Sequence, residues 1–365
     1  MTQAAVLEQI GRPLRVTDVD LELPGPGEVA VEIGATGVCH SDVAIITGQL
    51  PAPLPLVPGH EGAGTVVEVG AGVTSLAAGD RVVLSWLAQC GICFYCRRWE
   101  PYLCGTARAL LATNALPGGA TRISADRQEV RQFCGLGTFA QRCVVLADSA
   151  IRVPSRLPMA AAALIGCGVL TGFGAAVNTA GIRVGNSVAV VGCGGVGLNA
   201  VQGARFAGAT TIIAIDRHAE RLALATELGA TDTVTAGPDA VREVKELTGR
   251  RGADVVLEVA GRAETVRSAV DMARRGGTVV LVGAAPDVVI DDVFNRLVMS
   301  GKTLRGCLYG SADVRRDVPR LVHLYEQGKL LLDQLVTESF GFPDINKAVE
   351  YGAAEQGARA VVMFS

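Results

Sequence analysis

The chain has 365 residues, of which 49% are hydrophobic and 19% are charged, and its formal net charge is −3. This length favours two domains of ordinary size, and the composition is that of a compact globular protein rather than a disordered or fibrous one. Because there is no long run of lysine or arginine, the sequence predicts no nucleic-acid surface and no basic patch for membrane lipid, so small molecules are the expected partners.

The N-terminal half is predicted to be rich in β-strands. It opens with MTQAAVLEQIGRPLRV, which lacks the basic stretch, apolar core and cleavage site of a secretory signal, so we expect a cytoplasmic protein. Up to about residue 155, apolar residues alternate in short runs that end at Gly, Pro or Asp, at 28–38, 64–70 and 80–86. This half also contains Cys39 in GVCHSD and His60 in PGHEGAG.

Four cysteines follow at short intervals, at positions 90, 93, 96 and 104. Cys90, Cys93, Cys96 and Cys104 have the spacing that lets one chain surround a tetrahedral ion, the closed four-cysteine pattern of structural zinc. The alternative is four unrelated buried cysteines. In a chain without an export signal, clustered cysteines usually bind metal rather than form disulfides.

The segment from Leu157 to Ile182 carries no charge, and it contains Cys167. Its length alone would allow it to span a bilayer. However, Pro158, Asn178 and several glycines interrupt it, and glycine disfavours a helix interior. We therefore expect a buried, small-residue helix in the core of a soluble protein.

From about 187 to 308, short apolar runs alternate with helical stretches such as 217–229 and 262–277. The runs lie at 187–191, 211–216, 231–236, 254–260, 278–283 and 303–308. This alternation indicates βαβ units that build a parallel sheet. The C-terminal part is mixed, with helices expected over 314–329 and near 344–355 and a last strand at 359–364.

A glycine-rich motif, GCGGVG, directly follows the first of these runs and opens a helical stretch. Its Gly192, Gly194 and Gly197 form the G-x-G-x-x-G arrangement, with Gly195 and Val196 between them, which places a pyrophosphate on the helix N-terminus. A glycine-rich turn without a ligand is the alternative. Asp216 ends the next run, where its carboxylate can bind the adenosine ribose and repel a 2′-phosphate. Arg217 and Arg221 could soften this preference for NAD over NADP, or simply be solvated.

A catalytic zinc requires about three protein ligands and one open position, and Cys39, His60 and Cys167 are the candidates. Taken alone, each of these residues is more often an ordinary buried side chain. Their combination depends on a resemblance. GHEGAG, the four-cysteine segment, GCGGVG and the Cys-His-Ser-Asp stretch, in this order over essentially the whole chain, resemble the zinc-dependent medium-chain alcohol dehydrogenases.

The resemblance implies an α/β protein with a GroES-like, β-rich catalytic domain and a Rossmann domain with a doubly wound parallel sheet. The catalytic domain would comprise 1–168 and 309–365, and the cofactor domain 169–308. It also implies NAD and two zinc ions per chain as cofactors. The stretch after Cys104 resembles the longer insertion of the dimeric branch, so a homodimer is expected.

By the same resemblance, Cys39, His60 and Cys167 are the catalytic zinc ligands, and Glu61 is the acidic neighbour of the metal. Asp42 is expected to orient His60, as metal-bound histidines commonly require. Ser41 is expected to take the proton of the alcohol. Thr171 and Val196 are expected to hold the nicotinamide, and His40 and Arg359 to lie beside the pyrophosphate. The substrate pocket is expected to include Trp86, Leu50, Ala109, Phe133 and Ala284.

Two departures from the family pattern leave questions open. Many members have a proton-relaying histidine where this chain has Ala44, so the relay must use His40, a ribose hydroxyl or water. Formaldehyde dehydrogenases that act on a glutathione adduct have an acid and an arginine at the pocket mouth. Here Arg108 matches the arginine, but Leu50 replaces the acid.

The sequence therefore predicts an oxidoreductase that transfers a hydride between a primary, apolar or aromatic alcohol or aldehyde and NAD. Two alternatives within enzymes are a formaldehyde dehydrogenase that acts on a thiol adduct and a relative that holds its nicotinamide permanently. From another class, the alternative is a dinucleotide-binding structural protein on the same fold.

Overall fold

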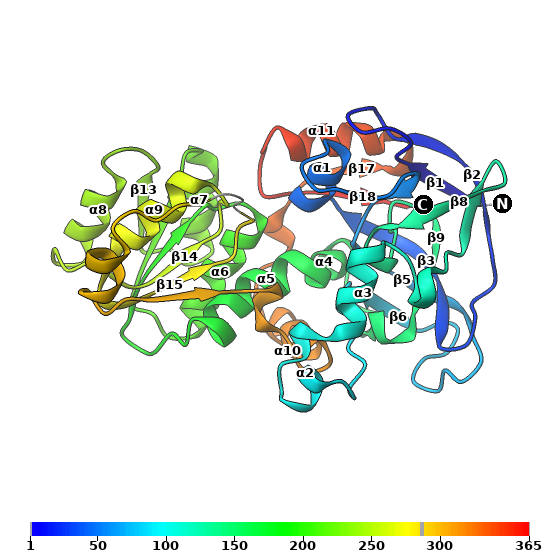
Figure 1. The fold of residues 1–365 in the computed structure, drawn as a ribbon, viewed down its shortest axis with the longest axis horizontal. Coiled ribbons are helices and arrows are strands. Elements are labelled where there is room, and N and C mark those ends of the chain that lie inside the picture. Colours follow the sequence, from blue (N-terminus) through cyan, green and yellow to red (C-terminus); the bar gives the residue numbers. More distant parts are fainter. Residues whose placement is uncertain (1, 285–287, 365) are drawn as a thin grey trace. The chain divides into compact units, whose positions relative to one another are not determined.

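The computed structural model describes residues 2–284 and 288–364, and the chain divides into two compact units (Figure 1). Unit 1 comprises Met1–Cys167 and Asp313–Ser365, and unit 2 comprises Gly168–Ala312. Unit 2 is thus inserted in the sequence of unit 1. The expected boundaries, after residues 168 and 308, lie one and four residues from those of the structure, after 167 and 312.

Within the described residues, unit 1 contains two largely antiparallel sheets, with strand orders β1-β2-β7-β8-β4 and β10-β6-β5-β3-β18-β17, and β9 pairs with β3. Neighbouring strands in the second sheet include β3 and β18, which come from the two ends of the chain. The strands are β1 Thr2–Val6, β2 Arg15–Leu21, β3 Glu28–Gly37, β4 Leu56–Val57, β5 Glu61–Val69, β6 Arg81–Leu84, β7 Ile123–Ala125, β8 Gln128–Gln132, β9 Arg142–Leu146, β10 Ala150–Arg152, β17 Val336–Gly341 and β18 Arg359–Met363.

Unit 1 also has short helices between and after these strands. They are α1 His40–Ile46, α2 Phe94–Arg97, α3 Gly105–Thr113, α4 Met159–Leu164, α10 Val314–Glu326 and α11 Ile345–Ala353. Most residues of β3, and those in the first half of β5, are buried, so these strands lie at the centre of the unit. Val29, Val31, Ile33, Val66 and Leu84 belong to one core of the unit.

Unit 2 contains a parallel sheet in the order β13-β12-β11-β14-β15-β16. Its strands are β11 Ser187–Val191, β12 Thr211–Asp216, β13 Asp232–Thr235, β14 Ala253–Glu258, β15 Ala273–Leu281 and β16 Thr303–Gly306, and its helices are α5 Leu170–Gly174, α6 Gly195–Phe206, α7 Ala219–Glu227, α8 Ala240–Leu247 and α9 Ala263–Met272. The strand order reverses between β11 and β14, where open α/β sheets bind ligands beyond the carboxyl ends of their strands. The predicted α/β class, with a β-rich unit and a doubly wound sheet, is confirmed.

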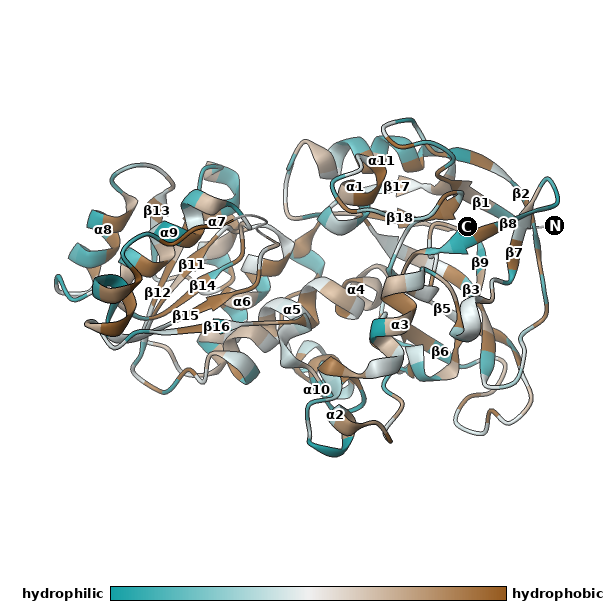
Figure 2. Cartoon of the chain, viewed as in Figure 1, coloured by the Kyte–Doolittle hydropathy of each residue, from teal (hydrophilic) through white to brown (hydrophobic). Residues whose placement is uncertain are grey.

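The central strands of this sheet are apolar because helices cover them, whereas β16 at one edge is exposed. Val191, Ile213, Val256 and Val279 are buried in one cluster. Figure 2 shows the same contrast, with hydrophobic colour along the strands and hydrophilic colour on α8. One expected helix is wrong at its end: the helical stretch predicted over 262–277 stops at Met272, because Ala273 already pairs with Ala253 and two glycines follow at 276 and 277.

The uncharged segment forms helical turns over Met159–Thr179, as predicted, but two of its turns, Ile165–Val169 and Ala175–Thr179, are wider π-helical turns that the sequence did not indicate. By length and composition this stretch could cross a membrane. Most of it is buried inside the protein, which is equally typical of the core helix of a soluble protein.

Candidate functional site

In unit 1, three separate segments bring Cys39, His60, Glu61 and Cys167 together. One ligand atom of each lies within 4.8 Å of those of the others, and all four residues are buried. Cys39 precedes α1, His60 and Glu61 stand where β5 begins, and Cys167 lies in the π-helical turn Ile165–Val169. Two thiols, an imidazole and a carboxylate at this spacing form a donor set suited to zinc.

The Asp42 carboxylate fixes the orientation of His60. Its Oδ1 lies 2.8 Å from His60 Nδ1 and accepts the backbone N–H of Gly59 at 3.0 Å, while its Oδ2 accepts the N–H of Cys39 at 2.9 Å. When Nδ1–H donates to a carboxylate, Nε2 is left as the lone-pair nitrogen that binds a metal. Asp42 therefore orients both the imidazole and the backbone that carries the Cys39 thiol.

Glu61 is held by a cation from the other end of the chain. Its Oε1 lies 2.9 Å from Arg359 Nη2, and both residues are buried. Its Oε2 has no hydrogen-bond partner among the described residues. A buried oxygen of this kind beside two thiols and an imidazole fits a metal ion as its missing partner.

The charged forms of these groups depend on one another. Burial raises the pKa of Glu61 to about 7, against the opposing effect of Arg359. Burial disfavours the imidazolium of His60, but the Asp42 carboxylate outweighs it and raises the pKa of His60 well above its ordinary value. The Cys167 thiol donates to Cys39, which holds the pKa of Cys39 well below the usual range of a thiol. A low thiol pKa favours the thiolate, the form that binds metal.

Two glycines that motif analysis did not single out make room for this group. A Cβ on Gly37 would collide with Glu61 Oε2, and a Cβ on Gly166 would collide with the carbonyl oxygen of Leu84 on β6. The only signal for them in the sequence was that each lies within two residues of a candidate ligand.

The structure brings Ser41, the predicted acceptor of the alcohol proton, near the group. Ser41 Oγ lies 3.9 Å from Cys39 Sγ. His40 is exposed, and Ala44 is buried and has no group that could carry a proton.

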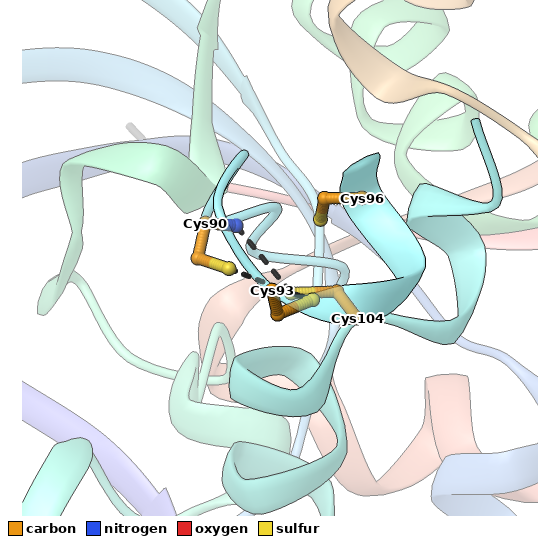
Figure 3. A group of neighbouring side chains, drawn as sticks. All are labelled: Cys90, Cys93, Cys96 and Cys104. Carbon is orange, nitrogen blue, oxygen red and sulfur yellow. Dashed lines mark hydrogen bonds between the residues drawn. The ribbon is translucent and has the colours of Figure 1, made fainter. Parts of the chain in front are cut away.

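The four-cysteine segment brings its four cysteine side chains together, as Figure 3 shows. One sulfur each of Cys90, Cys93, Cys96 and Cys104 lies within 4.8 Å of the others. Cys104 Sγ lies 3.6 Å from Cys90 Sγ and 4.0 Å from Cys93 Sγ, and it accepts the N–H of Cys90 at 3.4 Å. Backbone N–H groups of Cys96 and Gly105 directed at Cys93 lower its pKa to about 6. Four sulfurs with backbone donors fit a closed tetrahedral zinc site.

In unit 2, the glycine-rich loop joins β11 to α6. Gly192 has φ +94°, Gly194 caps α6, and a Cβ on Gly197 would collide with the carbonyl oxygen of Gly192. Gly195 and Val196 form the first turn of α6, and Gly172 lets α5, which includes Thr171, approach the carbonyl of Val196. The loop thus has the strand-turn-helix geometry that places a pyrophosphate at a helix N-terminus.

Asp216 ends β12 beside this loop. Its Oδ2 accepts the N–H of Cys193 at 2.7 Å, and its Oδ1 accepts the N–H of His218 at 2.9 Å. Arg221 reaches to 3.9 Å from the carboxylate, whereas Arg217 is exposed and donates to His218. Asp216 therefore also stabilises the glycine-rich loop, a contact that the sequence did not reveal.

The residues expected in the substrate pocket have different environments. Phe133 is buried and meets the His60 ring edge-on, with centroids 5.1 Å apart. Trp86 is half-buried and packs against both main cores of unit 1. Leu50 and Ala109 are exposed in unit 1, and Ala284 is exposed in unit 2.

Comparison with known proteins identifies the family. Residues 25–155 match the alcohol dehydrogenase GroES-like domain, and residues 195–327 match the zinc-binding dehydrogenase family. The chain is 38% identical to the NDMA-dependent alcohol dehydrogenase of Amycolatopsis methanolica, over 100% of this chain and 99% of that protein. It is 37% identical to the S-(hydroxymethyl)glutathione dehydrogenase of a Synechocystis strain, over 100% of both chains.

A solved structure agrees with these relatives. The benzyl alcohol dehydrogenase of Acinetobacter calcoaceticus superimposes with a TM-score of 0.93 at 32% identity, covering 100% of this chain and 99% of that one. Two family matches in successive parts of the chain, full-length relatives and a shared fold all agree with the candidate metal and dinucleotide sites described above. The chain therefore belongs to the zinc-dependent medium-chain alcohol dehydrogenase family and is an oxidoreductase.

Proposed function

We propose that this enzyme oxidises primary alcohols with an apolar or aromatic chain to aldehydes, and reduces those aldehydes, with NAD as the cofactor. The observation that carries the proposal is the buried group of Cys39, His60 and Cys167 with Glu61 beside it. Three such donors leave a fourth position for substrate. When bound, zinc supplies Lewis acidity and the nicotinamide supplies the hydride acceptor.

The chain's own residues have distinct tasks in this reaction. Asp42 keeps His60 Nε2 free for the metal. Ser41, beside Cys39, would take the proton of the alcohol, and His40 on the exposed first turn of α1 would pass it toward solvent. Phe133 would exclude water from the His60 side. A dry site strengthens each electrostatic interaction in it.

The proposal for NAD depends on Asp216. Its buried carboxylate at the end of β12 would face the adenosine ribose and repel a 2′-phosphate. Arg359 and His40 remain the residues proposed for the pyrophosphate, and Thr171 and Val196 those for the nicotinamide.

Two zinc ions per chain are proposed, because the two donor sets differ in kind. Cys90, Cys93, Cys96 and Cys104 form a closed set of thiols, whereas the second set includes an imidazole and a carboxylate. The zinc ion in the four-cysteine set would hold that segment in shape, and the zinc ion in the other set would bind substrate.

A homodimer is proposed for the assembly. The edge strand β16 pairs with β15 on one side only, among the described residues, and its four residues are exposed. The chain from 289 to 308 also exposes Val289, Val293, Phe294, Val298, Met299, Leu304 and Leu308. An unpaired edge with apolar neighbours is a surface that proteins usually cover.

A cytoplasmic location is proposed as well. All ten cysteines are free, and both metal sites need reduced thiols. Reducing compartments keep such clusters from forming disulfides.

The test is a screen of alcohols and aldehydes with NAD and with NADP, monitored as reduced cofactor. We expect hexanol and benzyl alcohol to exceed ethanol in kcat/KM, and NAD to exceed NADP. Benzyl alcohol is included because one similar structure is named a benzyl alcohol dehydrogenase. No turnover of any alcohol, with both zinc ions present, would reject the proposal.

The same screen separates the alternatives. Higher efficiency with S-(hydroxymethyl)glutathione than with any simple alcohol would favour the thiol-adduct reaction, which one relative's name describes. The exposed, apolar Leu50 argues against that reaction, because it offers no charge to a glutathione adduct. Cofactor that remains bound through native gel filtration would favour a permanently held nicotinamide.

A further inference from the structure

The carboxyl group of Glu258 is the least expected group in the sheet of unit 2. Glu258 is the last residue of β14, and its exposed fraction is 0%. Its Oε1 accepts the N–H of Gly261 at 2.9 Å and the Thr265 hydroxyl at 2.8 Å. Its Oε2 has no hydrogen-bond partner among the residues that the structure describes. Burying a carboxyl with half of its acceptor capacity unused costs free energy, so an apolar side chain would stabilise the sheet better.

The C-terminal end of β14 is joined to the loops on both sides of it. The Glu258 carbonyl accepts the N–H groups of Val282 at 2.8 Å and Gly283 at 3.1 Å, just after β15. On the other side, Val259 and Ala260 donate to the carbonyl of Val191, where the glycine-rich loop begins. The loop after β14 therefore lies between the glycine-rich loop and the loop after β15.

The loops after β14 and β15 pack closely together where Gly261 binds the Glu258 side chain. Gly261, whose N–H binds Oε1, has φ +68°, and a Cβ there would lie 2.9 Å from the backbone nitrogen of Ala284. A Cβ on Gly283 would collide with Gly261 in turn. The backbone at Gly261 and the backbone at 283–284 are too close to move independently. The hydrogen bond from Gly261 to Glu258 therefore holds both segments in position.

We infer that Glu258 is a positioning residue for the nicotinamide half of the dinucleotide, acting through Gly261 and the backbone at 282–284. In a doubly wound sheet, the strands from β11 to β13 form the mononucleotide half that binds adenosine, and β14 to β16 form the second half. Because Glu258 ends the first strand of the second half, its loss should disturb the nicotinamide side and spare the adenosine side. This inference rests on the proposed function, since it requires that the enzyme bind a nicotinamide dinucleotide.

The experiment compares NADH with AMP on the zinc-loaded enzyme. Dissociation constants for NADH are measured by fluorescence titration, and those for AMP by competition. In Glu258→Ala we expect the NADH constant to rise about tenfold or more while the AMP constant changes less than about twofold. Glu258→Gln keeps an oxygen that can accept from Gly261 and Thr265, so its NADH constant should stay within about threefold of the native value.

Glu264→Gln is the matched control, because it makes the same change on an exposed residue of α9 and should leave both constants unchanged. If Glu258→Ala does not fold, Thr265→Val is used instead, because it removes one of the two hydrogen bonds to Oε1. The dissociation constant for NADH should then rise by a smaller factor, and that for AMP should not change. A merely structural role would weaken NADH and AMP equally. That result, or an unchanged NADH constant in Glu258→Ala, would overturn the inference. If the native enzyme binds neither molecule, the proposed function itself fails.

Discussion

At the scale of single residues, the proposed metal site of Cys39, His60 and Cys167 needs a glycine at position 37 as well as its ligands. Gly37→Ala places a methyl group against Glu61 Oε2, and the surrounding residues are too buried to yield. We expect the zinc affinity of this site to fall roughly tenfold to a hundredfold, the usual effect of disturbing groups around a metal's ligands. Zinc content after dialysis against a weak chelator should fall from two ions toward one.

Gly237→Ala serves as the control, since a Cβ at that position meets no atom within 4 Å. It should retain both ions. If Gly37→Ala retained both as well, the buried oxygen of Glu61 would have no bearing on the metal.

Asp216 makes a structural contact in addition to its proposed role in cofactor choice, and the cofactor test must separate the two. Asp216→Gly removes the charge that opposes a 2′-phosphate, so the ratio of kcat/KM with NAD to that with NADP should fall by about tenfold or more. The same change removes the acceptor of the Cys193 N–H, so efficiency with both cofactors should also fall. Steady-state kinetics with both cofactors give the ratio. A native enzyme that prefers NADP would contradict the prediction.

Trp86 is the residue proposed to select primary alcohols. Its half-buried indole would crowd the second substituent of a secondary alcohol, so Trp86→Ala should lower the ratio of efficiencies for hexanol over a matched secondary alcohol. Each methylene that the apolar wall buries contributes about 0.8 kcal/mol, which is why hexanol should exceed ethanol. Trp99→Ala is a matched control, because Trp99 is 89% exposed. An unchanged ratio in Trp86→Ala would mean that the indole only packs in the core.

The residues of both candidate metal sites could be named from the sequence, but several of their partners could not. Cysteine spacing named the four-cysteine set, because a closed zinc site needs thiols at short intervals. The family resemblance was needed to combine Cys39, His60 and Cys167. The pair of Glu61 and Arg359 joins residues 298 positions apart, which no local pattern reveals. The bond between Asp216 and Cys193 likewise depends on which strands become neighbours in the sheet.

At the scale of elements, the four-cysteine segment should depend on its metal for its structure. It contains only a helix of four residues, α2, and one short 3₁₀ turn, with little core of its own. Cys104→Ser should therefore lower the melting temperature and the yield of folded enzyme, because structural zinc binding contributes directly to folding free energy. Cys167→Ala should instead abolish activity and release one zinc while the fold persists. Calorimetry and metal analysis of the two variants check this. Equal losses of stability in both would contradict the division into a structural and a catalytic site.

Regular elements were predicted better than irregular ones, for a physical reason. The central strands of unit 2, β11, β12 and β14, are covered by helices and read as largely apolar runs. Their alternation with helical stretches fixes the class. The π-helical turn that carries Cys167 has no such periodic signal, and it lies where Gly166 closely approaches the backbone of β6. The end of α9 was misjudged because pairing of Ala273 with Ala253 outweighs local helix propensity.

At the scale of the whole molecule, the homodimer proposal makes a prediction about the edge of the sheet in unit 2. If β16 and its apolar neighbours form the interface, a charge placed there must be desolvated against a second copy of itself, because a twofold interface brings the same patch together twice. The variant Phe294→Glu with Leu304→Glu should therefore shift the enzyme from dimer to monomer in sedimentation velocity. Burying each large apolar side chain contributes about 2 kcal/mol, so losing two on each of two chains exceeds what most reversible dimers can tolerate.

Val184→Glu changes an isolated valine that is 84% exposed in the same unit, and it should leave the dimer intact. A double variant that still sediments as a dimer would show that β16 is not the interface, and a monomeric native enzyme would reject the proposed assembly itself.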